Sequence, residues 1–86
     1  MKQLIETIKN SREQLISRYY EVKNNIEVNQ TGRLEARKNN DPRAYEKLED
    51  EYFLLSAEFG STRMAVNELG NALCHLGVSV DTFWGE

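Results

Sequence analysis

Asn39-Asn40-Asp41-Pro42 is the stretch that decides the fold, because it contains the one proline in a chain of 86 residues. Asparagine tolerates the left-handed backbone of a tight turn, aspartate caps helix N-termini, and proline is favoured at the first helical position. The four residues therefore predict a turn over 39–41, with one helix ending before it and another beginning at Pro42.

Apolar residues recur at steps of three and four on both sides of this turn, as they do along one face of a helix. The first stripe comprises Met1, Ile5, Ile8, Leu15, Tyr19, Val22 and Ile26, with interruptions at Arg12, Asn29 and Arg33. The second comprises Tyr45, Leu48, Tyr52, Leu55, Phe59, Val66, Leu69, Leu73 and Leu76, with an interruption at Thr62. Opposing positions of the two stripes, such as Ile8 with Leu73, have numbers that add to 81. This constant sum predicts an all-α fold, a long antiparallel helical hairpin that is similar to a coiled coil.

The length of the chain predicts a single helical domain over residues 1–86. We expect the first helix over about 2–38, the turn over 39–41, the second helix over about 42–76 and a C-terminal hook over 77–86. The run from Asn29 to Gly32 favours helix poorly, and glycine costs about 1 kcal/mol relative to alanine inside a helix. A kink or break is therefore predicted near 30–32.

The C-terminal hook is predicted from the residues that follow Leu76. Gly77 suits the left-handed position that commonly ends a helix, and Val78 suits the apolar contact that follows it. Ser79 can then cap a short helical turn over 80–84. We expect this hook to fold onto the open end of the hairpin, near Met1, Leu4 and Ile8, and to bury Phe83 and Trp84.

The second helix carries apolar and small residues outside its stripe, which predicts a further packing partner. They are Phe53, Leu54, Ala57, Gly60, Ser61, Met64, Ala65 and Ala72. The simplest closed arrangement is a two-fold homodimer that forms a four-helix bundle. The alternative is a monomer in which the hook and a kinked first helix cover this face.

Charge is divided unevenly between the two halves of the chain. Residues 1–43 hold nine Lys or Arg and six Asp or Glu, whereas residues 44–86 hold two and eight. The structural interpretation is that opposite charges flank the stripes and favour antiparallel pairing. Basic residues gather near the turn, but acidic residues interleave with them and the formal net charge is -3. We therefore do not expect direct binding of nucleic acid. The alternative is that the acidic second helix contacts a basic surface of another protein.

Several classes of protein are excluded by composition and spacing. No stretch approaches the roughly 18 consecutive apolar residues of a membrane span, and the N-terminus becomes polar too soon for a signal peptide. One cysteine, Cys74, and one histidine, His75, are too few for a zinc site within one chain. We expect Cys74 to be a buried thiol. The sequence predicts a cytoplasmic protein that is not an enzyme, with no metal and no cofactor.

The polar interruptions of the first stripe need partners, because a buried charge without one is costly. In the structural interpretation Arg12 reaches Glu68, Arg33 reaches Glu49, and Asn29 fixes the register with Tyr52. In the alternative interpretation three residues line a cavity in an oligomer and bind a small anion. These candidate anion-binding residues are Arg12, Tyr19 and Thr62.

The sequence as a whole predicts a non-catalytic protein-binding module that acts as a small regulator, adaptor or inhibitor of another macromolecule. Its size is compatible with a regulator from a phage or mobile element. Aromatic and arginine residues dominate binding hot spots, so the candidate partner-binding residues are Tyr20, Tyr45, Arg63, Phe83 and Trp84. The alternative function is a helical oligomer that sequesters a small anionic ligand or a nucleotide.

Overall fold

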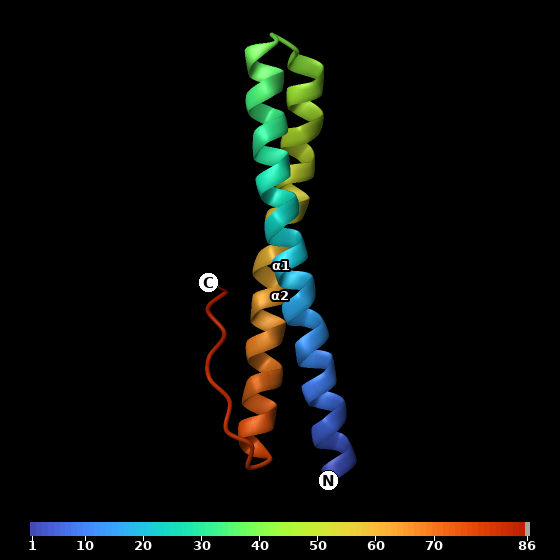
Figure 1. Ribbon diagram of the computed structural model, residues 1–86, viewed down its shortest axis with the longest axis vertical. Coiled ribbons are helices and arrows are strands. Elements are labelled where there is room, and N and C mark those ends of the chain that lie inside the picture. The colour runs from blue at the N-terminus through green and yellow to red at the C-terminus, as the bar shows by residue number, and fades with distance from the viewer. Residues whose placement is uncertain (86) are drawn as a thin grey trace.

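Two long helices pack side by side in a hairpin, and a C-terminal tail runs back along them (Figure 1). The structure is a computed structural model that describes residues 1–85. Helix α1 spans Lys2–Lys38 and helix α2 spans Pro42–His75. The molecule measures 57 × 18 × 14 Å. The predicted all-α hairpin is confirmed, and Glu86, the last residue of the predicted domain and hook, lies outside the described residues.

The turn forms as its residues predict. Asn40 has a φ of 53°, in the left-handed region. Asp41 is the N-cap of α2, and its Oδ1 accepts a hydrogen bond of 3.1 Å from the backbone N–H of Ala44. Pro42 occupies the first turn of the helix. Because the turn is this short, the two helices must pack antiparallel along their length.

The core is a narrow seam between the helices. Its fully buried members include Tyr19 and Val22 of α1 and Val66 and Leu73 of α2, all of which belong to the predicted stripes. Across the seam, Tyr19 stacks on Phe59 and the Asn29 side chain reaches the Leu48 backbone. These contacts lie within about one helical turn of the predicted facing positions.

Of the kink or break predicted near 30–32, the break is wrong, because α1 continues through these residues to Lys38, and a kink there stays a prediction. Gly32 lies against the opposite helix: a Cβ at this position would be 3.2 Å from Cδ1 of Leu48. The absence of a side chain therefore relieves crowding against Leu48 at this position, and the packing outweighs the low helix propensity of the run.

The end of α2 agrees with the prediction, but the hook does not. Gly77 has a φ of 86°, and the Val78 N–H donates to the Leu73 carbonyl at 2.9 Å, which completes the expected left-handed end. Beyond it the predicted helical turn over 80–84 is absent, and residues 78–85 lack helical structure. The tail runs back along α2 toward the middle of the hairpin instead of covering its open end (Figure 1).

Cys74 is exposed, so the prediction of a buried thiol is wrong. It follows Leu73 directly on the helix, and a step of about 100° carries it off the narrow seam. Within residues 1–85, no helix combines the length and the hydropathy that crossing a lipid bilayer requires.

Candidate functional site

The tail is held on the helices through its backbone. The Asn67 side chain makes two hydrogen bonds with Phe83: its Nδ2 donates to the carbonyl at 3.0 Å, and its Oδ1 accepts from the backbone N–H at 2.8 Å. The Arg12 Nη2 donates to the Asp81 carbonyl at 3.1 Å. The Tyr19 hydroxyl donates to the Gly85 carbonyl at 3.3 Å. Side chains of the two helices therefore hold the backbone of every second tail residue, at positions 81, 83 and 85.

An aromatic cluster forms where the tail meets the helices. The Tyr19 ring stacks on Phe59 with ring centres 4.4 Å apart, and Phe83 packs edge-on against Tyr19 at 5.0 Å. Tyr20 packs edge-on against both Tyr19 and Phe83. Phe83 is only half-buried, so this cluster reaches the surface of the molecule.

Trp84 lies beside this cluster and is 71% exposed. Its neighbours in the chain, Phe83 and Gly85, are the two residues whose backbones are held. The expected burial of Trp84 is therefore wrong. The tail presents the indole to solvent from a backbone that is fixed on both sides.

The structure brings some of the predicted partner-binding residues together. Tyr20 and Phe83 are in contact, and Trp84 follows Phe83 in the chain. Arg63 is exposed on α2, one helical turn before Asn67, the residue that holds the tail. Tyr45 is separate from this group and lies beside the turn, where it contacts Arg37.

Two of the three predicted anion-binding residues, Arg12 and Tyr19, have hydrogen-bond partners within the chain. Arg12 donates to the Val66 carbonyl at 3.3 Å as well as to Asp81. Tyr19 and Thr62 are buried at 2% and 7% exposure. The bonds of Arg12 replace the expected contact with Glu68. A cavity lined by these residues in an oligomer stays a prediction.

The other polar residues of the seam also differ from the expected pairs. The Asn29 Nδ2 donates to the Leu48 carbonyl at 2.8 Å, and its Oδ1 accepts from the Arg33 Nε at 2.8 Å. The Arg33 guanidinium lies over the Tyr52 ring, 4.3 Å from its centre. Asn29 thus bridges the helices, and Arg33 interacts with an aromatic face.

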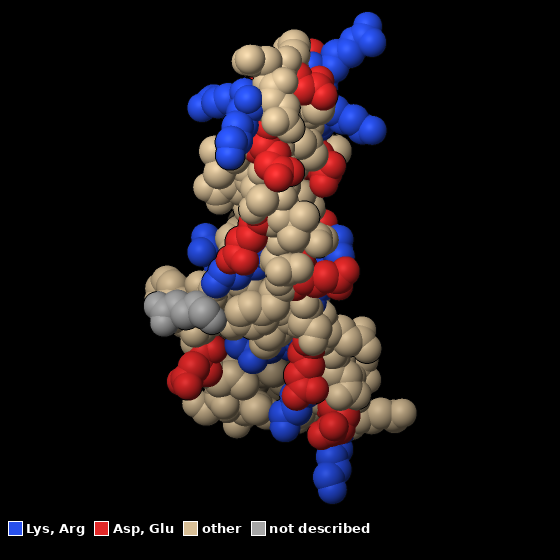
Figure 2. Space-filling model, turned by 45° about the horizontal axis from the view of Figure 1, so that its top comes forward, with Lys and Arg blue, Asp and Glu red and all other residues tan. Residues whose placement is uncertain are grey.

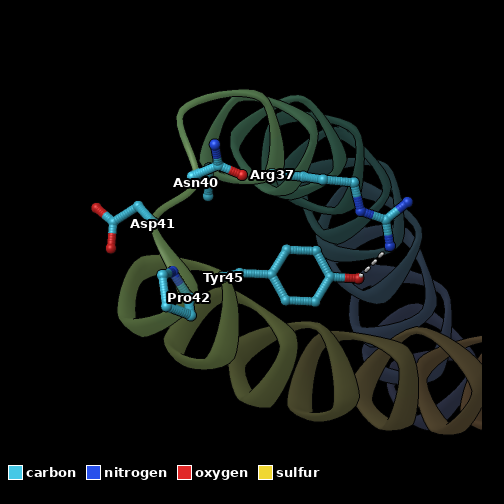
Figure 3. A pocket seen from close by; sticks show the side chains of 6 residues that line it. Arg37, Asn40, Asp41, Pro42 and Tyr45 are labelled. Atoms are coloured by element: carbon cyan, nitrogen blue, oxygen red, sulfur yellow. Dashed lines mark hydrogen bonds between the residues drawn. The ribbon is translucent and has the colours of Figure 1, made fainter.

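A second surface feature lies beside the turn. A hollow of about 490 Å³ is lined by Ala36, Arg37, Asn40, Asp41, Pro42 and Tyr45. The Arg37 Nη2 donates a hydrogen bond of 3.3 Å to the Tyr45 hydroxyl. Figure 3 shows these two groups facing each other, while the Asp41 carboxylate points away from both. The sequence analysis did not predict that Arg37 lines this hollow and contacts Tyr45. The spacing of Arg33 and Arg37 by four residues does indicate that they share a helix face.

Charges along the helices are interspersed. On the face seen in Figure 2, basic side chains project near the turn and acidic side chains lie between them. Arg18 forms a two-point contact with Glu58, with Nε–Oε2 and Nη2–Oε1 distances of 2.9 and 2.8 Å. This hydrogen bonding lowers the pKa of the Glu58 carboxyl and raises the pKa of the Arg18 guanidinium.

Comparison of the chain with protein-family models, with curated proteins and with solved structures found no match.

Proposed function

We propose that this protein is a non-catalytic protein-binding module that acts as a small regulator, adaptor or inhibitor of another macromolecule. The observation that carries the proposal is the exposure of Trp84, 71%, on a tail whose neighbouring backbone is fixed. A large apolar side chain with this exposure buries little of its surface against its own chain, so it contributes little to the stability of the fold. Tryptophan is also among the residues that contribute most to protein interfaces.

The fixed backbone adds to this argument. Binding through a mobile segment loses affinity to the ordering of that segment, whereas a segment that is already held avoids most of this cost. Hydrogen bonds to Asp81, Phe83 and Gly85 hold the tail before any partner arrives. Tyr20 and Arg63 then extend the surface around Trp84 with further residue types that are common at binding hot spots.

We further propose that the outer face of α2 packs against a second copy of the chain. Phe53, Leu54 and Met64 are between 62% and 74% exposed on this helix. A Cβ at Gly60 would meet nothing within 4 Å, so no contact within the chain calls for glycine there. Small residues between large apolar ones allow two helices to approach closely, and a two-fold pair would bury this face on both copies.

Photo-crosslinking in the native host tests the proposed function. A photoreactive residue at position 82, two residues before Trp84 in the sequence, should trap a distinct protein. The same residue at position 24, which is exposed on α1, serves as the control for non-specific capture. Trp84→Ala should abolish the product formed from position 82. A product that survives this substitution, or that forms equally from position 24, would contradict the proposal.

The alternative function, sequestration of a small anion by Arg12, Tyr19 and Thr62, is less favoured. The Arg12 and Tyr19 side chains already donate to backbone carbonyls that hold the tail. Thermal denaturation with a panel of nucleotides separates the two functions, because a ligand that binds the folded state raises the midpoint. A rise of several degrees would favour sequestration.

A further inference from the structure

Two arginines and two tyrosines form a pair of cation–π contacts beside the turn. The Arg33 guanidinium lies 4.3 Å from the centre of the Tyr52 ring, and that of Arg37 lies 5.4 Å from the centre of the Tyr45 ring. The arginines come from α1 and are four residues apart, so they lie on one face of the helix. The tyrosines come from α2. The contacts thus place two guanidinium groups on the same side of the hairpin.

Within residues 1–85, both guanidinium groups keep N–H donors that make no hydrogen bond. Arg33 uses its Nε with Asn29, and Arg37 uses its Nη2 with the Tyr45 hydroxyl. A guanidinium has five N–H donors in a planar arrangement that matches a carboxylate. Among residues 1–85, the ion pairs within 4.0 Å are those of Arg18, so neither Arg33 nor Arg37 is neutralised by a carboxylate of its own chain.

The surface around these groups combines apolar and polar lining. A hollow of about 160 Å³ is lined by Gln30, Arg33, Leu34, Arg37 and Tyr45. The larger hollow beside the turn shares Arg37 and Tyr45 with it and adds the apolar side chains of Ala36 and Pro42. Asn40 and Asp41 also line it, and the Asp41 carboxylate points away from Arg37 and Tyr45 (Figure 3). Leu34 is 61% exposed at its edge. The two hollows together offer charged donors next to apolar walls, and we name them the turn groove.

We infer that the turn groove binds an acidic segment of a protein partner, with a carboxylate between Arg33 and Arg37 and a neighbouring apolar side chain against Leu34 or Pro42. This inference rests on the proposed protein-binding function and names a second contact for it, at a surface separate from Trp84. A carboxylate suits the site because arginine binds it at two points. An apolar neighbour suits it because the adjoining wall is largely hydrocarbon.

Charge argues for a short acidic segment over nucleic acid. A nucleic acid carries a phosphate at every nucleotide and needs a basic surface along its length. Glu35, Asp41 and Glu46 interleave with the basic residues near the turn, and the formal net charge of the chain is -3. These carboxylates would repel the phosphates of a nucleic acid that lies along the surface. A short acidic segment that contacts only Arg33 and Arg37 avoids most of this repulsion.

NMR titration of the full chain tests the inference. The probe is an acetylated, amidated peptide of sequence Leu-Glu-Glu-Phe, and the side-chain Nε–H signals of the arginines report on binding. We expect saturable shifts for Arg33 and Arg37 with a Kd below about 1 mM. The peptide Leu-Gln-Gln-Phe should bind at least about fivefold more weakly, because it lacks the charge.

Matched variants separate the site from general charge. Arg37→Gln should weaken binding at least about fivefold, and Arg37→Lys should also weaken it because lysine lacks the planar pair of donors. Arg43→Gln removes the same charge near the turn but lines neither hollow, so it should change the Kd less than about twofold. Circular dichroism melting confirms that each variant folds.

Each remaining outcome overturns the inference. These are no saturable shift, equal binding of the two peptides, equal effects of Arg37→Gln and Arg43→Gln, and tighter binding of single-stranded oligothymidylate than of the acidic peptide. Trp84→Ala should bind the peptide as the unmodified chain does. The peptide assay thus fails or succeeds independently of the crosslinking from position 82 that tests the proposed function.

Discussion

The side-chain amide of Asn67 pairs with the backbone of Phe83 through two hydrogen bonds, of 3.0 and 2.8 Å, as a neighbouring strand would. This contact joins the C-terminal third of α2 to a tail residue sixteen positions later. Because both the N–H and the carbonyl of Phe83 are satisfied, the tail can lie on the helices without helical hydrogen bonds of its own.

Asn67→Ala should release the tail. The loss of two hydrogen bonds should lower the free energy of unfolding by about 1–2 kcal/mol, measured by urea denaturation. The amide of Phe83 should exchange with solvent much faster, measured by hydrogen exchange. Asn24→Ala, at an exposed position of α1, should leave that exchange unchanged. Slow exchange at Phe83 in Asn67→Ala would show that the pair does not hold the tail.

The ion pair between Arg18 and Glu58 should make stability depend on pH. Hydrogen bonding to Arg18 lowers the pKa of Glu58 in the folded state. The pair therefore stabilises the fold above the ordinary carboxyl pKa, and this contribution is lost as pH falls through the lowered value. Both side chains are about 40% exposed, so the effect should be small.

Thermal denaturation of Glu58→Gln between pH 7 and pH 3 measures this contribution. The unmodified chain should melt higher at pH 7, and the difference should shrink as the pH falls. Glu51→Gln, at an exposed position of the same helix, should show a smaller difference. A difference that grows toward acid pH would contradict the sign of the pKa shift.

Gly60→Ala should stabilise the single chain. A Cβ at this position meets nothing within 4 Å, and alanine is favoured over glycine in a helix by about 1 kcal/mol. Urea denaturation at low protein concentration should therefore show a gain of about 0.5–1 kcal/mol. If a second copy packs on this face as proposed, the same substitution should weaken self-association in sedimentation equilibrium.

Gly70→Ala is the matched comparison for that gain. A Cβ at Gly70 would lie 3.3 Å from Cγ2 of Val80 and 3.4 Å from Nε of Arg12, so it would press on the tail. The helix gains the same propensity, but this crowding should offset it. The gain for Gly70→Ala should thus be smaller than for Gly60→Ala. Equal gains would mean that the tail does not pack against Gly70.

Cys74 should react with dithiobisnitrobenzoate without unfolding, because its side chain is exposed near the end of α2. Its rate in the native protein should lie within about threefold of the rate in urea. Absorbance of the released thionitrobenzoate measures both rates. A native rate that tracks global unfolding would indicate that another surface covers Cys74, and Leu76→Cys on a Cys74→Ser background supplies a half-buried thiol for comparison.

The parts of the fold that were predicted depend on local chemistry. The cap at Asp41, the left-handed Asn40 and the left-handed end at Gly77 each follow from the conformational preferences of one residue and its neighbours. The stripes of the two helices follow from the spacing of apolar residues at steps of three and four, which any seam between two helices requires. These features need no knowledge of the rest of the chain.

The tail was predicted wrongly because distant residues determine its conformation. Ser79 and the residues after it favour a helical turn locally, but Asn67 accepts from the Phe83 N–H and Arg12 donates to the Asp81 carbonyl, and a helical turn would use both of these groups. Gly32 is a similar case. A side chain at this position would crowd Leu48 of the opposite helix, so the packing between the helices favours glycine there although its helix propensity is low. Tertiary contacts of this kind override local propensity.

The candidate site was predicted only in part for the same reason. Residue type alone identified Tyr20, Phe83 and Trp84, and the tail brings these residues close together. It also grouped Tyr45 with them, although Tyr45 lies at the turn beside Arg37. No periodic pattern indicated Asn67, because a single asparagine on a helix is an ordinary surface residue until the segment that it binds is known.

The helices hold residues 81–85 by main-chain atoms, and this has a consequence for engineering. Carbonyl and amide groups are the same whatever amino acid carries them, so the attachment does not depend on the identity of Thr82 or Trp84. Libraries that randomise these two positions should retain the scaffold while changing what it recognises, which makes the hairpin a compact carrier for grafted peptides.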